Sequence, residues 1–355
     1  MAPARLSPDA LALPIVQAPL AGGPSTPALA AAVSRAGGLG FLAAGYKTVD
    51  AVAADVEAVR TATDAPFGIN VFVPGGAPAD AEAVARYAAT LAAEAERQGA
   101  LLGEPRSDDD DWDAKLALLH ARRPAVASFT FGCASRELVA ALQGDGVAVW
   151  VTVTTPAEAH VAAEAGADAL VVQGAEAGGH RGSFDDAGAG GMGIGLLALL
   201  QLVRAEVELP LIASGGIMTG AAIAAVLAAG ASAAQLGSAL LLTPEAGTST
   251  PHRAAVAGAG ETALTRAFSG RTARGIVNRF LREHDAAAPS AYPAVHHLTA
   301  PLRAAARERG DGEAINLWAG QAHALARDRP AGELVAQLAA DARAALRVAA
   351  ERAGG

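Results

Sequence analysis

The residues with the clearest capacity for chemistry lie in one short segment, Val171 to Gly182, which reads Val-Val-Gln-Gly-Ala-Glu-Ala-Gly-Gly-His-Arg-Gly. The segment begins as an apolar strand, passes a glutamine and then presents His180 in a glycine-rich loop. Glycines allow backbone N–H groups to approach a ligand closely, where a side chain would block the approach. Because histidine titrates near neutral pH, His180 could move protons there. The segment predicts a ligand site, and a flexible loop with a surface histidine is the alternative.

Two other short segments have the glycines and the hydroxyl groups that a phosphate site needs. They are Ser214-Gly-Gly-Ile217 and Gln235-Leu-Gly-Ser238, and each ends a short apolar run. Glycines let backbone N–H groups converge on phosphate oxygens, and the Ser238 hydroxyl would add a donor. Close packing of a strand against a helix also favours glycine, so a structural role is the alternative.

Other patterns in the chain predict less chemistry. The Gly-x-Gly-x-x-Gly pattern at 188–193 lies well beyond the strand and has no ribose-binding acid after it, so we interpret it as a mobile part of the histidine loop. His296 and His297 lack further metal ligands at helical spacing, which favours a surface or lid pair. The acidic run 107–113 is expected to be a solvated loop. Because Cys133 is the only cysteine, neither an internal disulfide nor a cysteine-rich zinc site is expected, and no metal site is predicted elsewhere.

The spacing of apolar residues and glycines predicts strands that alternate with helices. Three Ala-Gly phrases, which begin at Ala36, Ala165 and Ala229, each close an alanine-rich helix and lead into a strand. Gly166 and Gly230 lie 64 residues apart, which fits two strand–helix units of about 32 residues. Strands are expected near 15–20, 40–44, 67–73, 125–132, 148–154, 169–173, 211–215 and 233–238. Helices are expected near 27–36, 48–63, 135–143, 156–165, 194–205 and 219–229.

This alternation predicts an α/β fold, a (β/α)8 TIM barrel with a mainly helical lid domain formed by insertions. We expect the barrel to comprise residues 1–73 and 122–243. The lid would comprise 74–121 and 244–355, with the last helix free to pack on the barrel. The long connection after the third strand should contain a helix at 80–98. In such barrels phosphate commonly binds at the loops after strands seven and eight, where the two glycine segments fall.

Composition and charge exclude several classes of function. The net charge is −9 and no long stripe of basic residues exists, so nucleic-acid binding is not expected. Lys47 and Lys115 are the only lysines, and neither lies in a predicted strand, which disfavours Schiff-base catalysis. The uncharged stretch 209–244 is broken by glycine turns, so it is interpreted as a buried strand–helix–strand unit rather than a membrane helix. Since no signal peptide is evident, we expect a soluble, cytoplasmic protein.

These motifs together resemble those of the nitronate monooxygenase family, the FMN-dependent enzymes formerly called 2-nitropropane dioxygenases. The resemblance covers nearly the whole chain, and Glu176-Ala-Gly-Gly-His-Arg-Gly182 is its most specific part. The other segments that carry it are residues 17–40, 67–72, 213–218 with the Gln235 loop, and 269–279.

The resemblance implies that FMN lies across the mouth of the barrel. Asn70 and Gln173 would hydrogen-bond the isoalloxazine or ribityl edge, and His180 would be the active-site base or the electrostatic partner of the substrate. The remaining residues implied to contact FMN are Ala21, Gly22, Gly178, Gly216, Gln235, Leu236, Gly237 and Ser238. The implied reaction is oxidation of alkyl nitronates, with nitroalkanes as further candidate substrates, by O₂ to a carbonyl compound plus nitrite. An imidazole can remove the α-proton of a nitroalkane and stabilise the resulting anion.

The chain departs from the family pattern at the expected substrate end of the pocket. Relatives often carry histidine in the Ser-Phe-x-Phe-Gly strand, where this chain has Thr130. Downstream of Tyr292-Pro293 they often show tyrosine and then lysine, where this chain has His296 and Ala300. The resemblance therefore defines the cofactor better than the substrate.

Other functions stay open at this point. A related FMN barrel could be an NAD(P)H:quinone reductase or an enoyl-thioester reductase, although no nicotinamide cleft is evident. A phosphosugar isomerase or aldolase would not explain Asn70 and Gln173, whereas a non-catalytic flavin-binding protein fits the Thr130 departure. Arg271 or Arg274 could bind a substrate carboxylate or pair with carboxylates of the lid. The sequence does not indicate the oligomeric state.

Overall fold

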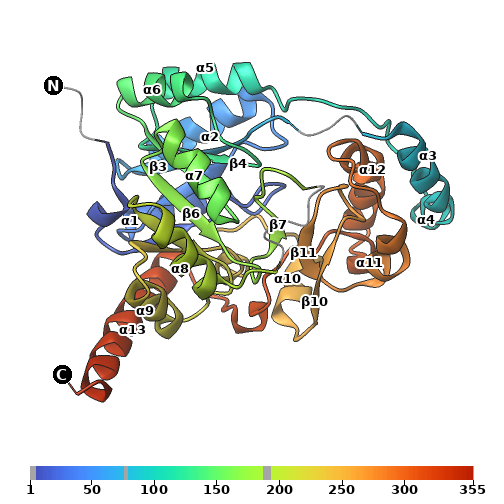
Figure 1. Cartoon of the computed structure of the whole chain (residues 1–355). Coiled ribbons are helices and arrows are strands. Elements are labelled where there is room, and N and C mark those ends of the chain that lie inside the picture. Colours follow the sequence, from blue (N-terminus) through green and yellow to red (C-terminus); the bar gives the residue numbers. More distant parts are fainter. Residues whose placement is uncertain (1–4, 76–78, 187–192, 355) are drawn as a thin grey trace.

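A barrel of parallel strands forms one part of the molecule, and a group of helices and short strands lies beside it (Figure 1). The computed structural model describes residues 5–75, 79–186 and 193–354. The barrel strands are rich in Ala, Val, Ile and Leu, as expected where both faces of a parallel sheet are covered. They are β1 (Ile15–Gln17), β2 (Gly40–Ala43), β3 (Phe67–Phe72), β4 (Val126–Thr130), β5 (Ala148–Val153), β6 (Ala169–Gln173), β8 (Leu211–Ser214) and β9 (Ala233–Leu236).

The eight strands pair in parallel in the order β1-β9-β8-β6-β5-β4-β3-β2. The two ends of this order meet through an isolated bridge between Val16 and Leu39. Here the Leu39 N–H donates to Ile15 O at 3.0 Å, and the Gln17 N–H donates to Leu39 O at 2.9 Å. The sheet therefore closes, and the carboxyl ends of its strands meet at one mouth. The predicted (β/α)8 barrel is confirmed.

Helices cover the outside of the barrel, and capping residues explain where two of them begin. Thr26 accepts a hydrogen bond from the Leu29 N–H, and Thr155 accepts one from the Glu158 N–H; each threonine precedes a proline. The covering helices are α1 (Pro27–Arg35), α2 (Val49–Ala62), α5 (Trp112–Arg122), α6 (Arg136–Gly144), α7 (Pro156–Ala165), α8 (Leu196–Glu206) and α9 (Gly220–Ala228). The last helix, α13 (Ala331–Arg352), packs on α9 and α1 and extends away from the barrel (Figure 1).

The second part, the lid, is formed by the connection after β3 and by the chain after β9. Its elements are α3 (Ala81–Thr90), α4 (Ala92–Gln98), α10 (Thr250–Ala257), β10 (Thr262–Thr265), β11 (Ala273–Ile276), α11 (Arg279–His284) and α12 (Ala294–Glu308). An apolar cluster that includes Tyr87, Phe268 and Phe280 forms its core. The single helix expected at 80–98 is in fact two helices, which meet at Leu91. At the end of the same connection, α5 packs on α2 and β3 and so lies with the barrel helices.

The histidine loop after β6 joins the barrel to the lid. Its strand β7 (Gly179–His180) pairs antiparallel with β11, so that Ala273 lies opposite His180. Because this loop is inserted between β6 and β8, strands β6, β8 and β9 begin at the unequally spaced positions 169, 211 and 233. The expectation of equal units of about 32 residues is therefore wrong here.

One expectation falls outside the described residues: they do not include most of the Gly-x-Gly-x-x-Gly pattern, residues 188–192. The expectation about the uncharged stretch 209–244 can be compared. In the described part of the chain, no helix is both long and apolar enough to cross a membrane. The uncharged stretch 209–244 contains β8, α9 and β9, as its glycine turns predicted.

Candidate active site

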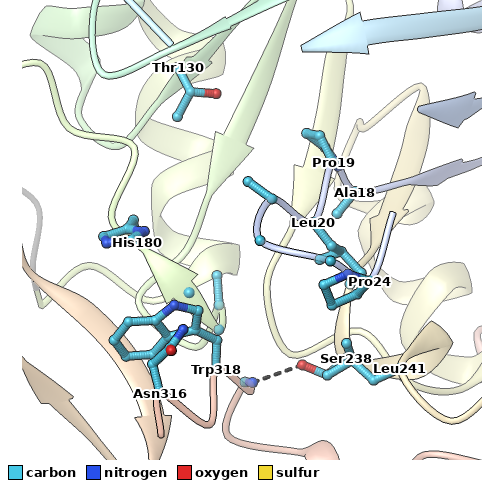
Figure 2. Close-up of a pocket in the computed structure, with 18 of the residues that line it drawn as sticks. Ala18, Pro19, Leu20, Pro24, Thr130, His180, Ser238, Leu241, Asn316 and Trp318 are labelled. Carbon is cyan, nitrogen blue, oxygen red and sulfur yellow. Dashed lines mark hydrogen bonds between the residues drawn. The ribbon is translucent and has the colours of Figure 1, made fainter. Parts of the chain in front are cut away.

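A cavity of about 410 Å³ lies at the carboxyl ends of the barrel strands, between the strand-end loops and the lid. Figure 2 shows the segment 18–24 on one side of it and His180, Asn316 and Trp318 on the other. This volume is typical of a site for a small molecule or cofactor, and catalytic sites of this fold lie at this end of the barrel. The cavity is therefore the candidate active site.

The histidine loop is held against the end of β6 by its own polar side chains. The Gln173 amide donates to the His180 carbonyl oxygen at 3.1 Å and accepts from the Gly182 N–H at 2.8 Å. Arg181 is buried and turns back to donate to the carbonyl oxygens of Gln173 at 2.9 Å and Gly174 at 2.6 Å. These bonds fix the backbone on both sides of the histidine.

Two further residues of the loop are explained by their neighbours. Both carboxylate oxygens of Glu176 accept from the Leu196 N–H at 3.0 Å, and so they cap the first turn of α8. Gly178 lies so close to the lid that a Cβ would come within 2.4 Å of backbone atoms of Ala319 and Gly320. The motif Glu-x-Gly-x-His thus serves to hold His180 between the barrel and the lid.

The imidazole of His180 is enclosed by one hydroxyl group and several aromatic rings. Its Nε2 lies 2.8 Å from Ser269 Oγ. The rings of Phe131, Tyr292 and Trp318 have centroids 5.9, 6.0 and 5.4 Å from its own. Within the described residues its Nδ1 has no hydrogen-bond partner, so this nitrogen is available to a ligand in the cavity.

The surroundings of His180 keep its ring neutral. Burial, and then the positive charge of Arg271, lower the pKa of His180 to about 3; Arg303 acts in the same direction and Asp186 opposes them. A neutral imidazole can accept a proton. At neutral pH, however, it carries no charge with which to attract an anion.

Another part of the cavity wall has the features of a phosphate site. Gly215 and Gly216, which follow β8, have φ angles of +124° and +67°, which residues with a side chain rarely adopt. After β9 the short 3-10 helix η2 (Ser238–Leu240) begins at the same wall. The Ser238 Oγ accepts a hydrogen bond from the Gly320 N–H of the lid at 2.8 Å (Figure 2). This arrangement matches the phosphate position of many (β/α)8 barrels.

Polar side chains at the ends of neighbouring strands meet on the barrel side of the cavity. The Asn70 amide nitrogen donates to Ser128 Oγ at 2.9 Å and to Thr130 Oγ1 at 3.0 Å. The Thr130 and Thr152 hydroxyl oxygens lie 3.4 Å apart. The Asn70 amide oxygen has no partner within the described residues, so it is oriented as an acceptor for a bound group.

Several cavity residues come from segments in which the sequence showed no motif. Tyr46, in the loop after β2, has a φ of +66°, and its ring stacks on His296 with centroids 4.2 Å apart. A non-glycine residue with positive φ is often found at functional sites. Arg303 and Asn316 also line the cavity. No local signal identifies these residues, because their partners lie far away in the chain.

The predicted cofactor residues are largely brought together. Those on the cavity wall are Ala21, Gly22, Asn70, Gln173, Gly178, Gly216, Gln235, Gly237 and Ser238. Leu236 is fully buried in the barrel core and does not line the cavity. Of the departures at the expected substrate end, Thr130 and His296 line the cavity, whereas Ala300 does not.

Arg271 and Arg274 do not bind lid carboxylates. The Arg271 Nε donates to Arg181 O at 3.4 Å, and its guanidinium lies 3.9 Å from the centre of the Phe131 ring. The Arg274 Nε donates to Ala175 O at 3.0 Å. Within the described residues neither arginine forms an ion pair, and both hold the histidine loop.

The acidic run 107–113 was expected to be a solvated loop, but two of its carboxylates form specific contacts. Asp110 pairs with the buried Lys115 at 2.8 Å and accepts from the Tyr46 N–H at 3.0 Å. Asp108 lies 2.6 Å from His297 on α12. The run therefore fixes the loop that carries Tyr46, and His297 points to this run while its neighbour lines the cavity.

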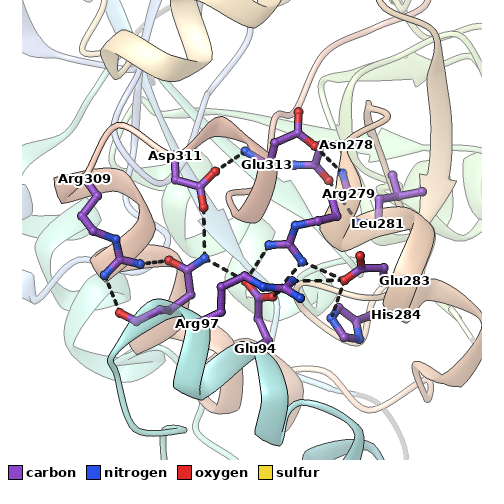
Figure 3. Close-up of polar contacts among 11 residues, drawn as sticks. Glu94, Arg97, Asn278, Arg279, Leu281, Glu283, His284, Arg309, Asp311 and Glu313 are labelled. Atoms are coloured by element: carbon purple, nitrogen blue, oxygen red, sulfur yellow. Dashed lines mark hydrogen bonds and ion pairs between the residues drawn. The ribbon is translucent and has the colours of Figure 1, made fainter.

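One other cluster in the described residues has ligating groups close enough for a metal ion. It comprises Glu94, Glu283 and His284 (Figure 3). Arg279 donates to both carboxylate oxygens of Glu94, at 2.8 and 2.9 Å, and to Glu283 at 2.7 Å. Arg97 also pairs with Glu94 at 2.8 Å. The carboxylates are therefore already paired with arginines. We call Glu94, Glu283, Arg97 and Arg279 the arginine clasp, and we assign it the role of joining α4 to α11.

Comparison with known proteins gives consistent matches over the whole chain. The sequence profile of a family described as nitronate monooxygenase matches residues 6–341. A nitronate monooxygenase from Pseudomonas aeruginosa is 46% identical over 342 residues, which cover 93% of this chain and 96% of that protein. The structure of a nitroalkane oxidase from Streptomyces ansochromogenes has a TM-score of 0.93 and 53% identity, over 96% of this chain and 99% of that one. FabK from Thermotoga maritima, at 24% identity and a TM-score of 0.74 over 97% and 96%, shares the fold.

Proposed function

We propose that this chain, which belongs to the nitronate monooxygenase family, oxidises alkyl nitronates with O₂ to a carbonyl compound and nitrite. The resemblance seen in the motifs is confirmed by the family match. Members of this family are flavin-dependent oxidoreductases. The observation that carries the proposal is that His180 lies on the same cavity as the paired glycine loops after β8 and β9.

We further propose that the flavin is FMN. The backbone around Gly216 and Ser238 would hold its phosphate, and Asn70 offers an oriented amide oxygen that suits the N–H of an isoalloxazine ring. Both ends of the Gln173 amide already form hydrogen bonds within the histidine loop. Gln173 would therefore shape the cavity wall beside the isoalloxazine ring. Ala21, Gly22, Gly178, Gln235 and Gly237 complete the wall. When bound, FMN would supply the redox chemistry between the substrate and O₂.

The residues of the chain would position the substrate and handle its proton. His180 presents a neutral ring whose Nδ1 is available, while Ser269 holds the other nitrogen. This ring could take the α-proton of a nitroalkane, whereas a preformed nitronate needs no such transfer. Phe131, Tyr292 and Trp318 would exclude water from the imidazole.

The proposal is tested by an anaerobic titration of the purified flavoprotein, first with ethylnitronate and then with NADH. Bleaching of the flavin by ethylnitronate, followed by nitrite formation when O₂ is admitted, is the expected result. Bleaching by NADH alone would indicate a reductase, and no bleaching by either would indicate a flavin-binding protein without turnover. The cofactor released by heat should elute as FMN on chromatography; an FAD peak would contradict its identity.

A further inference from the structure

Arg303 is a buried guanidinium that lines the cavity and has only neutral partners. It lies on α12 and is 7% exposed. Its Nε donates to Thr299 Oγ1 at 3.1 Å, and its Nη1 donates to Asn316 Oδ1 at 3.3 Å. Its Nη2 donates to His296 O at 2.9 Å and lies 3.4 Å from His296 Nδ1. Within the described residues no carboxylate lies within ion-pair distance of it.

The neutral partners leave the charge of Arg303 uncompensated. Burial, and then Arg303 itself, lower the pKa of His296 to about 2, so that this ring is uncharged at neutral pH. A guanidinium has five N–H groups, and these contacts use four of them, which leaves one on Nη1. A buried charge without a counter-charge is costly, and proteins normally pair it. An anion in the cavity would supply the missing partner.

The other positive groups near the cavity are less suited to that role. The imidazole of His180 is neutral, as described above. Arg271 lies over the Phe131 ring and does not line the cavity. Arg307, one turn further along α12, also lines the cavity, but it is exposed, so solvent screens its charge.

We propose that Arg303 is a specificity-determining residue whose unused Nη1 N–H binds an anionic oxygen of the nitronate, while His180 meets the substrate as an uncharged group. The inference rests on the proposed function for the identity of the anion. A charged N–H donor forms a stronger hydrogen bond to an anionic oxygen than a neutral donor does. Arg303 thereby selects the anionic nitronate over the neutral nitroalkane.

Asn316→Asp gives the sharpest test, because it adds a carboxylate next to Arg303 and removes no atom that Arg303 contacts. In the flavin-loaded enzyme this variant should raise the KM for ethylnitronate about 10- to 100-fold, the range expected when a charged hydrogen bond is lost. It should weaken equilibrium binding of nitrate, a planar monoanion, by a similar factor, as measured by the change in flavin absorbance. Its Tm should rise, because the buried charge gains a partner.

Arg303→Gln and Arg303→Lys complete the series. The glutamine variant should weaken nitrate binding by about 10- to 100-fold, as Asn316→Asp does. The lysine variant, which keeps the charge, should retain clearly more of the wild-type affinity than the glutamine variant. Arg307→Gln removes the other, exposed charge of the cavity wall and tests that competing cation, with an expected change below about threefold. Flavin content and Tm report whether each variant is folded.

The outcomes separate the inference from the proposed function. If Asn316→Asp binds nitrate and ethylnitronate as the wild type does, or if Arg307→Gln alone weakens them, the role of Arg303 is wrong. If the wild type oxidises no nitronate, the proposed function fails, and nitrate binding still decides whether Arg303 is an anion site. A fall in Tm for Asn316→Asp with anion binding unchanged would also overturn the inference.

Discussion

Arg279 and Arg303 are both arginines of the lid, yet they meet opposite surroundings. Arg279 lies in the arginine clasp, where the carboxylates of Glu94 and Glu283 accept its hydrogen bonds (Figure 3). Arg303 has a hydroxyl, an amide and an uncharged histidine as its partners. The clasp uses its charges to hold the lid together, whereas the cavity leaves a charge free for a ligand.

The clasp also shows what pairing does to a buried acid. Burial alone would raise the pKa of Glu94, but hydrogen bonds from Arg279 and Gln98 bring it below its usual value. The Glu94 side chain is 1% exposed, so it depends on these partners. Substitutions in the two regions should therefore have different consequences: loss of ligand binding in the cavity and loss of stability in the clasp.

The clasp contains fixed carboxylates, and the largest effect is expected when a fixed carboxylate is introduced at the proposed phosphate site of the cavity. Gly216→Asp should abolish flavin binding while the barrel still folds, because like charges repel and the side chain blocks approach to the backbone. Flavin absorbance per mole of purified protein measures this. Gly216→Ala carries the cost of the φ of +67° and a Cβ 3.1 Å from Glu176, but no charge, and is the control. Normal flavin content in Gly216→Asp would place the phosphate elsewhere.

The next largest effect is expected from the neutral imidazole of His180. His180→Asn should retain FMN but lose activity with nitroethane by about 10²- to 10⁴-fold, because a nitroalkane must be deprotonated. The loss with ethylnitronate should be smaller, since this substrate is already an anion. Oxygen uptake with both substrate forms gives the ratio. Equal, small losses would show that His180 does not handle the proton.

In the clasp, Glu94→Gln should reduce stability by about 2 kcal/mol, because the partly buried Arg279 loses two charged hydrogen bonds and keeps only the one to Glu283. Urea unfolding measures this, and kcat should stay unchanged, since the clasp does not line the cavity. Glu82→Gln removes the same charge from an exposed pair with Arg86 and should cost less than about 0.5 kcal/mol. Similar losses in both variants would contradict the structural role of the clasp.

The smallest effect is a pH dependence of stability that belongs to the cavity. The pKa of His296 is lowered to about 2, below that of an unfolded histidine, so the unfolded state binds more protons as the pH falls below about 6.5. Stability should therefore decrease between pH 6.5 and 5, by at most about 1.4 kcal/mol per pH unit for this group. His296→Gln should flatten the dependence of Tm on pH. His160→Gln, at an exposed helix position, should not; an unchanged slope in His296→Gln would refute the assignment.

The sequence determined the barrel and much of the cavity wall. Its strand positions, the Thr-Pro helix starts and the glycine loops after β8 and β9 follow from short-range effects, namely side-chain periodicity, capping and backbone freedom. The histidine loop was predicted for the same reason, because Gln173, Glu176, Gly178 and Arg181 act within a few residues of His180 or on the next helix.

Tertiary structure alone decided which charged side chains face the cavity. Arg279 and Arg303 both lie on lid helices that mix apolar and basic residues, and nothing local distinguishes them. Arg279 contacts Glu94, which lies 185 residues away in the sequence, and the Tyr46 ring stacks on His296, which is still further away in the sequence. The pairing of β7 with β11 likewise joins distant segments. Such contacts depend on how whole elements pack, and packing energies are summed over the fold rather than written in any one segment.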